Sequence, residues 1–321
     1  MADIVRTSRL TKVVLGKEIV SEVSMTIEKG EIYGFLGPNG AGKTTFMKIL
    51  TNLVRPTRGT IELFGEPVQP SSFLYLRRIG SMIEYPIFYE KKTAKENLII
   101  HCDYMGLNDR RAIGETLELV DLEASADAPV HTFSLGMKQR LGIARAILTR
   151  PELLILDEPI NGLDPAGIKK VIQLFRFLSR EHGTTLLISS HMLHEVEQLA
   201  DTLGVIKDGR MIEEVSMSKI RGKDTAYVEL VTPSPKKACV VLDRELKLTC
   251  TMASDDTIRI NAASYSQNDI TKVLIAHDIE IESISKKNKS LEEHFFSLLQ
   301  QHNKQNSWKG DANDQNNAVG N

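Results

Sequence analysis

The residues best suited to chemistry form a glycine-rich run that ends in a lysine and two threonines. The run consists of Gly37, Pro38, Asn39, Gly40, Ala41, Gly42, Lys43, Thr44 and Thr45. It matches the phosphate-binding pattern G-x-x-x-x-G-K-[ST], in which glycines let backbone N–H groups turn towards phosphate oxygens. The lysine of such a loop reaches the β- and γ-phosphates, and the hydroxyl of the following threonine can bind Mg²⁺.

The segments on either side of this run fit the same chemistry. Residues 31–36 are apolar and favour a strand, and residues 46–50 continue as a helix. The start of a helix adds partial positive charge beside a bound phosphate. An ordinary glycine-rich turn would explain the strand and the helix, but not a lysine and a threonine at the required spacing. The sequence therefore predicts a site for a nucleoside triphosphate and Mg²⁺.

Two adjacent carboxylates follow the apolar run of residues 153–156, which is typical of a strand buried on both faces. Asp157 at the end of such a strand is placed to hold Mg²⁺, directly or through water. Glu158 is placed to polarise the attacking water. Alone, the pair is also consistent with a solvated strand end. Together with the phosphate-binding loop, it predicts hydrolysis of the nucleotide.

Two further segments carry weaker signals. His191 comes shortly after the apolar run of residues 185–188, and at such a strand end its imidazole can reach the γ-phosphate. A single histidine is nevertheless more often structural. Ser134 is a good N-cap for a helix with apolar residues on one face. On physical grounds alone, that segment is an ordinary capped helix.

The rest of the chain supplies the elements that must position these residues. Residues 4–210 alternate between short strands and helices, which indicates an α/β domain with a parallel sheet, placed at residues 1–215. Residues from about 77 to 150 have helical patterning and are predicted to be an insertion between sheet strands. An Asp-Gly pair within residues 204–212 predicts a hairpin.

The composition changes after residue 215. Residues 216–300 are predicted to form a small α+β accessory domain, and residues 301–321, which are rich in Asn, Gln and Gly, are predicted to be disordered. Within the accessory domain, strands are expected at residues 226–231, 257–260 and 279–284. Helices are expected at residues 267–276 and 291–300.

Composition also limits the function classes. The net charge of -2 gives no basic field, so no nucleic-acid partner is expected. The three cysteines, Cys102, Cys239 and Cys250, are scattered, which suits a reducing cytoplasm. No apolar run approaches the length of about 20 residues that spans a bilayer, and the first residues lack the apolar core of a signal peptide. Any role at a membrane is therefore expected to depend on a partner.

Taken together, the motifs resemble those of ATP-binding cassette (ABC) proteins, the nucleotide-binding subunits of transporters. Residues 37–44 resemble the Walker A loop, residues 133–137 the signature motif, residues 153–158 the Walker B strand, residues 161–164 the D-loop, and His191 the switch histidine. The motifs occur in the order of the family, over about the first two thirds of the chain.

The resemblance implies a fold, a mechanism and partners. The fold is a P-loop NTPase core of the ABC type, with a parallel sheet, an antiparallel N-terminal subdomain and a helical insertion. Two cassettes, most simply two copies of this chain, pack head to tail with ATP between them. Ser134 and Gly136 of one copy then contact the γ-phosphate held by the other. The family also implies an integral-membrane permease that holds the chain at the cytoplasmic face of the cell membrane.

Departures from the family pattern refine this expectation. The signature reads Phe-Ser-Leu-Gly-Met instead of Leu-Ser-Gly-Gly-Gln, but Ser134 and Gly136 remain. Glu84 stands where most members have glutamine, as in cassettes that export bacitracin and lantibiotic peptides, and a glutamate can still bind Mg²⁺. Val14 replaces the aromatic side chain that usually stacks on adenine, so relaxed base selectivity is expected.

The leading prediction is an ATPase subunit that couples ATP hydrolysis to export of a bacitracin-like peptide or a lantibiotic, giving resistance or self-immunity. Within transport, the alternative is another substrate, such as sodium or a drug. The alternative from another class is a soluble cassette ATPase of translation or DNA repair. Such proteins usually carry two cassettes or a long coiled coil, and this sequence shows neither.

Overall fold

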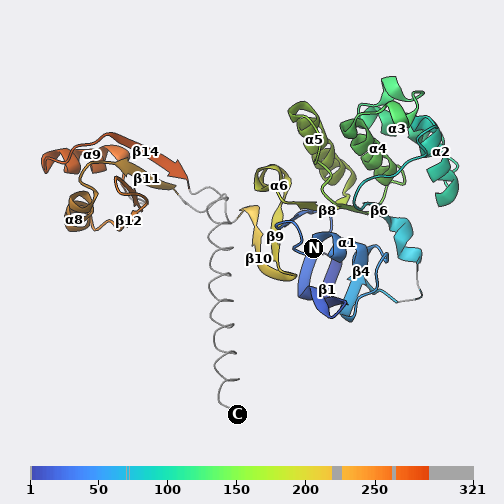
Figure 1. Cartoon of the computed structure of the whole chain (residues 1–321), viewed down its shortest axis with the longest axis horizontal. Helices are drawn as coiled ribbons and strands as arrows, with labels where there is room; N and C mark the ends of the chain where they lie inside the picture. The colour runs from blue at the N-terminus through green and yellow to red at the C-terminus, as the bar shows by residue number, and fades with distance from the viewer. Residues whose placement is uncertain (1, 70, 72, 219–225, 262–264, 289–321) are drawn as a thin grey trace, which may run out of the picture. The chain divides into compact units, whose positions relative to one another are not determined.

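The computed structural model describes residues 2–69, 71, 73–218, 226–261 and 265–288. The chain divides into two compact units, Met1–Met217 and Ser218–Asn321 (Figure 1). Each unit contains its own strands and its own buried apolar core.

A six-stranded sheet forms the centre of the first unit, with the strand order β10-β9-β3-β8-β7-β6. The strands that run parallel to one another are β3 (Ile32–Leu36), β6 (Ile79–Met82), β7 (Leu153–Leu156), β8 (Thr185–Ser190) and β9 (Thr202–Lys207). All residues of β3, β7 and β8 are buried, because apolar layers cover both faces of the sheet. The predicted α/β class with a parallel sheet is confirmed.

An antiparallel N-terminal sheet and helix α1 (Lys43–Leu50) cover one face of the central sheet (Figure 1). The N-terminal sheet has the order β2-β1-β4-β5 and consists of β1 (Asp3–Val14), β2 (Lys17–Glu28), β4 (Arg58–Leu63) and β5 (Glu66–Pro67). On β7, Leu153 and Ile155 belong to the apolar cluster of this layer, whereas Leu154 and Leu156 belong to the cluster on the opposite face. The expected antiparallel N-terminal subdomain is therefore present.

Helices cover the other face of the central sheet. They are α2 (Ala94–Met105), α3 (Arg111–Leu119), α4 (Leu135–Ile147), α5 (Pro165–His182) and α6 (Leu193–Leu199), accompanied by the short 3-10 turns η1 (Leu74–Arg78), η2 (Glu123–Ser125) and η3 (Val130–Thr132). The start of α2 is fixed by a capping box, in which Thr93 Oγ1 accepts from Glu96 N and Glu96 Oε2 accepts from Thr93 N. At α5 a single N-cap bond is present, in which Asp164 Oδ1 accepts from Gly167 N.

The predicted start of the helical insertion, near residue 77, is wrong. Ile79–Met82 forms β6 at the edge of the central sheet, where it pairs with β7. A Cβ atom at Gly80 would lie 2.0 Å from Ala146 O, so the strand approaches α4 more closely than any residue but glycine allows. After η1 (Leu74–Arg78), the next helix begins only at Ala94, beyond the bend that contains Glu84.

The predicted hairpin is confirmed. It joins β9 to β10 (Arg210–Ser216), which pair antiparallel. Asp208 and Gly209 in the turn have φ angles of 49° and 78°, the left-handed conformation that a two-residue hairpin turn needs at both positions. The Gly209 amide donates to Ala41 O at 3.0 Å, so this hairpin also supports the phosphate-binding loop.

The second unit is a small α+β fold. Its elements are β11 (Ala226–Val231), α8 (Pro235–Leu246), β12 (Cys250–Met252), β13 (Thr257–Ile260), α9 (Gln267–Ala276) and β14 (Ser283–Asn288). The sheet has the order β12-β13-β11-β14, and every pair is antiparallel. The strand expected at 279–284 begins only at Ser283, because Ile279 N still donates to Leu274 O and closes the end of α9. The helix expected at 291–300 and the tail at 301–321 lie outside the described residues.

Candidate functional site

The phosphate-binding loop connects the end of β3 to the start of α1 and is tightly enclosed on its outer side. A Cβ atom at Gly42, where φ is 103°, would lie 2.5 Å from Ile19 O. A Cβ atom at Gly37 would lie 2.3 Å from Ile206 O. At Gly40 a Cβ atom would meet nothing within 4 Å. Backbone oxygens of Ile206 and Ile19 therefore pack closely against the two ends of the loop, whereas its middle at Gly40 is open. A loop that binds phosphate needs such an open middle.

Lys43 occupies the centre of this cradle. Its side chain is only 6% exposed, and its Nζ donates to Gly37 O at 2.6 Å and to Pro38 O at 3.3 Å. The same Nζ lies 3.4 Å from Glu158 Oε1. A buried ammonium group needs such acceptors, and phosphate oxygens satisfy it in the same way.

Thr44 and Asp157 meet where α1 and β7 come together. Thr44 Oγ1 donates to Asp157 Oδ2 at 2.7 Å, and Ser189 Oγ donates to Asp157 Oδ1 at 2.6 Å. Asp157 is buried, and both of its carboxylate oxygens are therefore held in place. Parallel pairing of β7 with β8 explains this arrangement, because the carboxyl ends of both strands reach the same edge of the sheet.

Glu158 and His191 form the next pair along this edge. His191 Nδ1 lies 2.8 Å from Glu158 Oε2, and Ser189 Oγ accepts from Glu158 N at 2.9 Å. Glu158 adopts a φ of 48°, an uncommon backbone conformation for a residue other than glycine, and one that is often found at functional sites. The structure therefore brings Lys43, Asp157, Glu158 and His191 into one connected cluster.

The geometry fits a triphosphate and a hard divalent cation. No side chain among the described residues caps the start of α1, so its first amide groups remain available to an anion beside Thr44 and Thr45. A hydroxyl and a carboxylate oxygen meet at the Thr44–Asp157 contact. Mg²⁺ prefers oxygen ligands of this kind and completes its shell with water and substrate phosphates.

Ser134 and Gly136 lie at the start of α4, apart from this cluster. Ser134 Oγ accepts from Met137 N at 3.2 Å, which makes it the predicted N-cap. A Cβ atom at Gly136 would lie 3.3 Å from Leu163 Cδ2, in the predicted D-loop. Among the described residues, no hydrogen bond or ion pair joins Ser134 or Gly136 to residues 37–45.

Glu84 is not brought to the Thr44–Asp157 contact. Its side chain is 59% exposed, and Oε1 lies 2.7 Å from Lys48 Nζ, on the last turn of α1. Val14 ends β1 at a hairpin whose second strand passes close to Gly42, and its side chain is 44% exposed.

Two contacts of the site were not anticipated from the sequence. Ser189 binds both Asp157 and the Glu158 amide, and Gln139 Nε2 on α4 donates to Glu158 O at 3.0 Å. The consecutive serines before His191 were a usable signal for the first contact, because small hydroxyl residues at a buried strand end need partners. Nothing in the sequence pattern marks Gln139.

Comparison with known proteins agrees with this geometry. Residues 20–161 match the family model described as ABC transporter. Over 300 residues, which are 93% of this chain and 98% of the relative, the sequence is 61% identical to the uncharacterized ABC transporter ATP-binding protein YcbN of Bacillus subtilis (strain 168). With the same coverage it is 41% identical to the bacitracin transport ATP-binding protein BcrA of Bacillus licheniformis.

A shorter match and a solved structure extend the comparison. The lantibiotic transport ATP-binding protein SrtF of Streptococcus pyogenes is 45% identical over 198 residues, 62% of this chain and 84% of that protein. The dimeric structure of the ATP-binding cassette MJ0796 in a post-hydrolysis state, bound to ADP and Pi, matches with a TM-score of 0.62 and 25% identity. That match covers 66% of this chain and 98% of the other. The chain therefore belongs to the ABC transporter family, as an ATP-hydrolysing, ATP-binding subunit of the subgroup that includes bacitracin and lantibiotic transport proteins.

Proposed function

We propose that this ATPase powers the export of a peptide antibiotic of the bacitracin or lantibiotic kind, and so gives resistance or self-immunity. The observation that carries the hydrolytic part is the connected cluster of Lys43, Asp157, Glu158 and His191. The choice of cargo is supported by the 41% identity to a bacitracin transport protein over nearly the whole chain.

Within the site, each residue of the chain has a distinct task. Lys43 and the amides at the start of α1 bind the β- and γ-phosphates. Glu158 orients the attacking water and accepts its proton, and His191 holds the Glu158 carboxylate from the side opposite Lys43. Thr44 and Asp157 would hold Mg²⁺, which would supply positive charge against the phosphates.

Two copies of the chain form the working unit. Ser134 and Gly136 sit at the exposed start of α4, and among the described residues no hydrogen bond joins them to residues 37–45. A helix start favours an anion, so this end of α4 fits the γ-phosphate bound by a second copy. The dimeric post-hydrolysis structure of a related cassette supports this arrangement.

A membrane permease is the other partner. No described helix is both long enough and apolar enough to cross a bilayer. Tyr85, Ile87 and Tyr89, on the segment after Glu84, and Tyr104, on α2, are all exposed, and Tyr89 lies close enough to Tyr104 for the two side chains to interact. Large exposed apolar and aromatic side chains that gather together favour an interaction surface. We assign it to the permease, which would hold the chain at the cytoplasmic face of the cell membrane.

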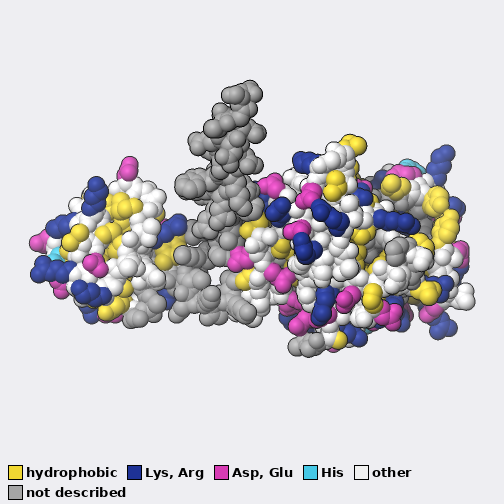
Figure 2. Space-filling model, turned by 90° about the horizontal axis from the view of Figure 1, so that it is seen from below, with side chains coloured by type: hydrophobic (Ala, Val, Ile, Leu, Met, Phe, Trp, Pro, Cys, Tyr) yellow, Lys and Arg dark blue, Asp and Glu magenta, His cyan; other side chains and the backbone are white. Residues whose placement is uncertain are grey.

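The face of the Met1–Met217 unit seen in Figure 2 does not favour a nucleic-acid partner. On the face of the Met1–Met217 unit shown in Figure 2, basic and acidic side chains are interspersed and form no continuous basic stripe. Several of the basic groups are also paired with carboxylates, as in Arg78–Glu152 and Lys170–Asp121. A basic stripe is the usual footprint of proteins that bind DNA or RNA.

The test of this proposal is genetic. A strain that lacks the gene is complemented with the wild type, with Glu158→Gln, or with Gln198→Ala as a surface control, and is exposed to bacitracin and several lantibiotics. Loss of the gene should raise sensitivity to at least one peptide, and only the wild type and the control should restore resistance. Unchanged sensitivity across the panel, with altered tolerance to sodium or a drug instead, would assign another cargo.

A further inference from the structure

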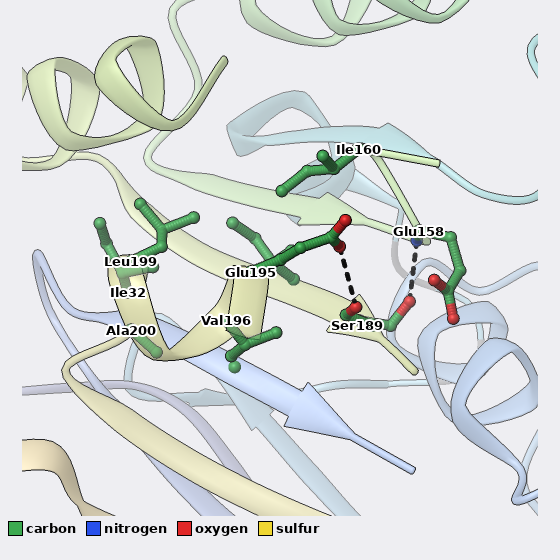
Figure 3. A pocket seen from close by; sticks show the side chains of 11 residues that line it. Ile32, Glu158, Ile160, Ser189, Glu195, Val196, Leu199 and Ala200 are labelled. Atoms are coloured by element: carbon green, nitrogen blue, oxygen red, sulfur yellow. Dashed lines mark hydrogen bonds between the residues drawn. The ribbon is translucent and has the colours of Figure 1, made fainter. Parts of the chain in front are cut away.

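A second carboxylate lies just beyond Glu158. It belongs to Glu195 on α6, and Figure 3 shows it pointing towards the end of β8, opposite the loop that carries Glu158. Glu158, Ser189, Ser190 and Glu195 all line one cavity there, with a volume of about 10 Å³. A space of that size admits at most one water molecule. This cavity is therefore too small for a nucleotide, and the hydrogen bond that Glu195 makes is to another residue of the protein.

Glu195 acts on the turn that carries His191. Ser190 Oγ donates to Glu195 Oε2 at 3.3 Å and accepts from Met192 N at 2.9 Å. The serine hydroxyl thus closes a short loop around His191, between the residue before it and the residue after it. Such serine turns fix the backbone of the residue that they enclose. His191 Nδ1 in turn reaches Glu158 Oε2 at 2.8 Å.

The position of Glu195 is set by the packing of α6. Val196, the next residue, lies against β3 so closely that a Cβ atom at Gly34 would be 2.1 Å from Val196 Cγ1. Leu193 and Leu199 on the same helix are also buried. Burial raises the pKa of the Glu195 carboxyl, whereas the Ser190 hydrogen bond and the charge of His191 lower it. Because α6 is held by this packing, the Glu195 carboxylate is kept where it can accept the hydrogen bond from Ser190 Oγ.

We propose that Glu195 is a positioning residue for hydrolysis, which orients the Ser190 hydroxyl and thereby holds His191 against Glu158. The inference rests on the proposed hydrolytic site. A competing acceptor exists, since Met192 O lies 3.2 Å from Ser190 Oγ. If the carboxylate is removed, the hydroxyl can rotate to that oxygen, and its bond from Met192 N is then misaligned. Loss of Glu195 should therefore loosen His191 without unfolding α6.

The test uses steady-state ATP hydrolysis by the full-length chain. Glu195→Ala should lower kcat by about fivefold and leave KM within about twofold, because only the water-orienting pair is disturbed. Glu195→Gln keeps an acceptor for Ser190 and should retain a kcat within about twofold of the wild type. Ser190→Ala should resemble Glu195→Ala, and the double variant should show little further loss. Gln198→Ala, on the exposed side of α6, is the matched control.

Several results would overturn the inference. They are an unchanged kcat in Glu195→Ala, a loss in Glu195→Gln as large as in Glu195→Ala, or losses that simply multiply in the double variant. Thermal unfolding of each variant separates a folding defect from a catalytic one, and Glu195→Gln keeps the side-chain volume. Glu158→Gln distinguishes the two proposals: if it hydrolyses ATP at the wild-type rate, the hydrolytic site fails and the inference fails with it. If Glu158→Gln is inactive while the Glu195 variants hydrolyse ATP with the kcat of the wild type, only the inference about Glu195 fails.

Discussion

Lys43 and Glu158 face each other across the nucleotide site, with Nζ 3.4 Å from Oε1. Lys43 is nearly buried, so its positive charge is compensated by Glu158 and by the carbonyl oxygens of Gly37 and Pro38. In the proposed site, a triphosphate competes with that carboxylate for Lys43. We therefore expect nucleotide binding to free Glu158 for a water molecule.

Replacing Glu158 with glutamine should separate ATP binding from ATP hydrolysis. The change removes the negative charge that competes with phosphate for Lys43, so ATP should bind about 3- to 10-fold more tightly. Hydrolysis should fall by about 100-fold or more, because an amide cannot accept the proton of water. Measured by size-exclusion chromatography, the variant should accumulate as a dimer with ATP. Hydrolysis at the wild-type rate would rule out Glu158 as the base.

Replacing Lys43 with alanine should abolish most nucleotide affinity. The phosphates lose their nearest cation, and the Glu158 carboxylate loses its ion pair with Lys43. Equilibrium titration with ATP should show a loss of about 100-fold or more. Lys170→Ala, which breaks the surface pair with Asp121, is the control and should bind normally. Near-normal binding by Lys43→Ala would contradict the assignment of the loop.

The sequence predicts the parts of the site that are local in the chain, and tertiary contacts decide the rest. The loop and the Asp157–Glu158 pair could be predicted because their chemistry depends on short spacings and on one strand end. The Ser189 and Gln139 contacts depend on which strand and which helix lie beside β7, and that follows from topology. Strand β6 was missed because Ile79–Met82 is short and flanked by turns, so its pairing with β7 has no periodic signal.

Glu84 and Lys48 should affect the Mg²⁺ requirement in opposite directions. Their ion pair is exposed and worth about 0–1 kcal/mol, so either residue can be changed without loss of stability. If Glu84 turns to the metal when nucleotide binds, Lys48→Ala frees it and should lower the Mg²⁺ concentration for half-maximal ATPase. Glu84→Gln should raise that concentration. If both variants and the wild type need the same Mg²⁺ concentration for half-maximal ATPase activity, Glu84 does not take part in metal binding.

With Val14 in place of an aromatic residue, the site should bind nucleotides with different bases about equally well. Its side chain is 44% exposed, Leu15 beside it is fully exposed, and neither side chain carries a donor or acceptor that distinguishes adenine from guanine. The wild type should therefore bind ATP and GTP within about threefold of each other. Val14→Tyr adds an aromatic face and should tighten binding of both nucleotides by about 3- to 10-fold. Leu119→Tyr, at a similarly exposed position on α3, is the control. A wild-type preference for ATP beyond about tenfold would mean that other groups read the base, because aliphatic contact alone discriminates too weakly.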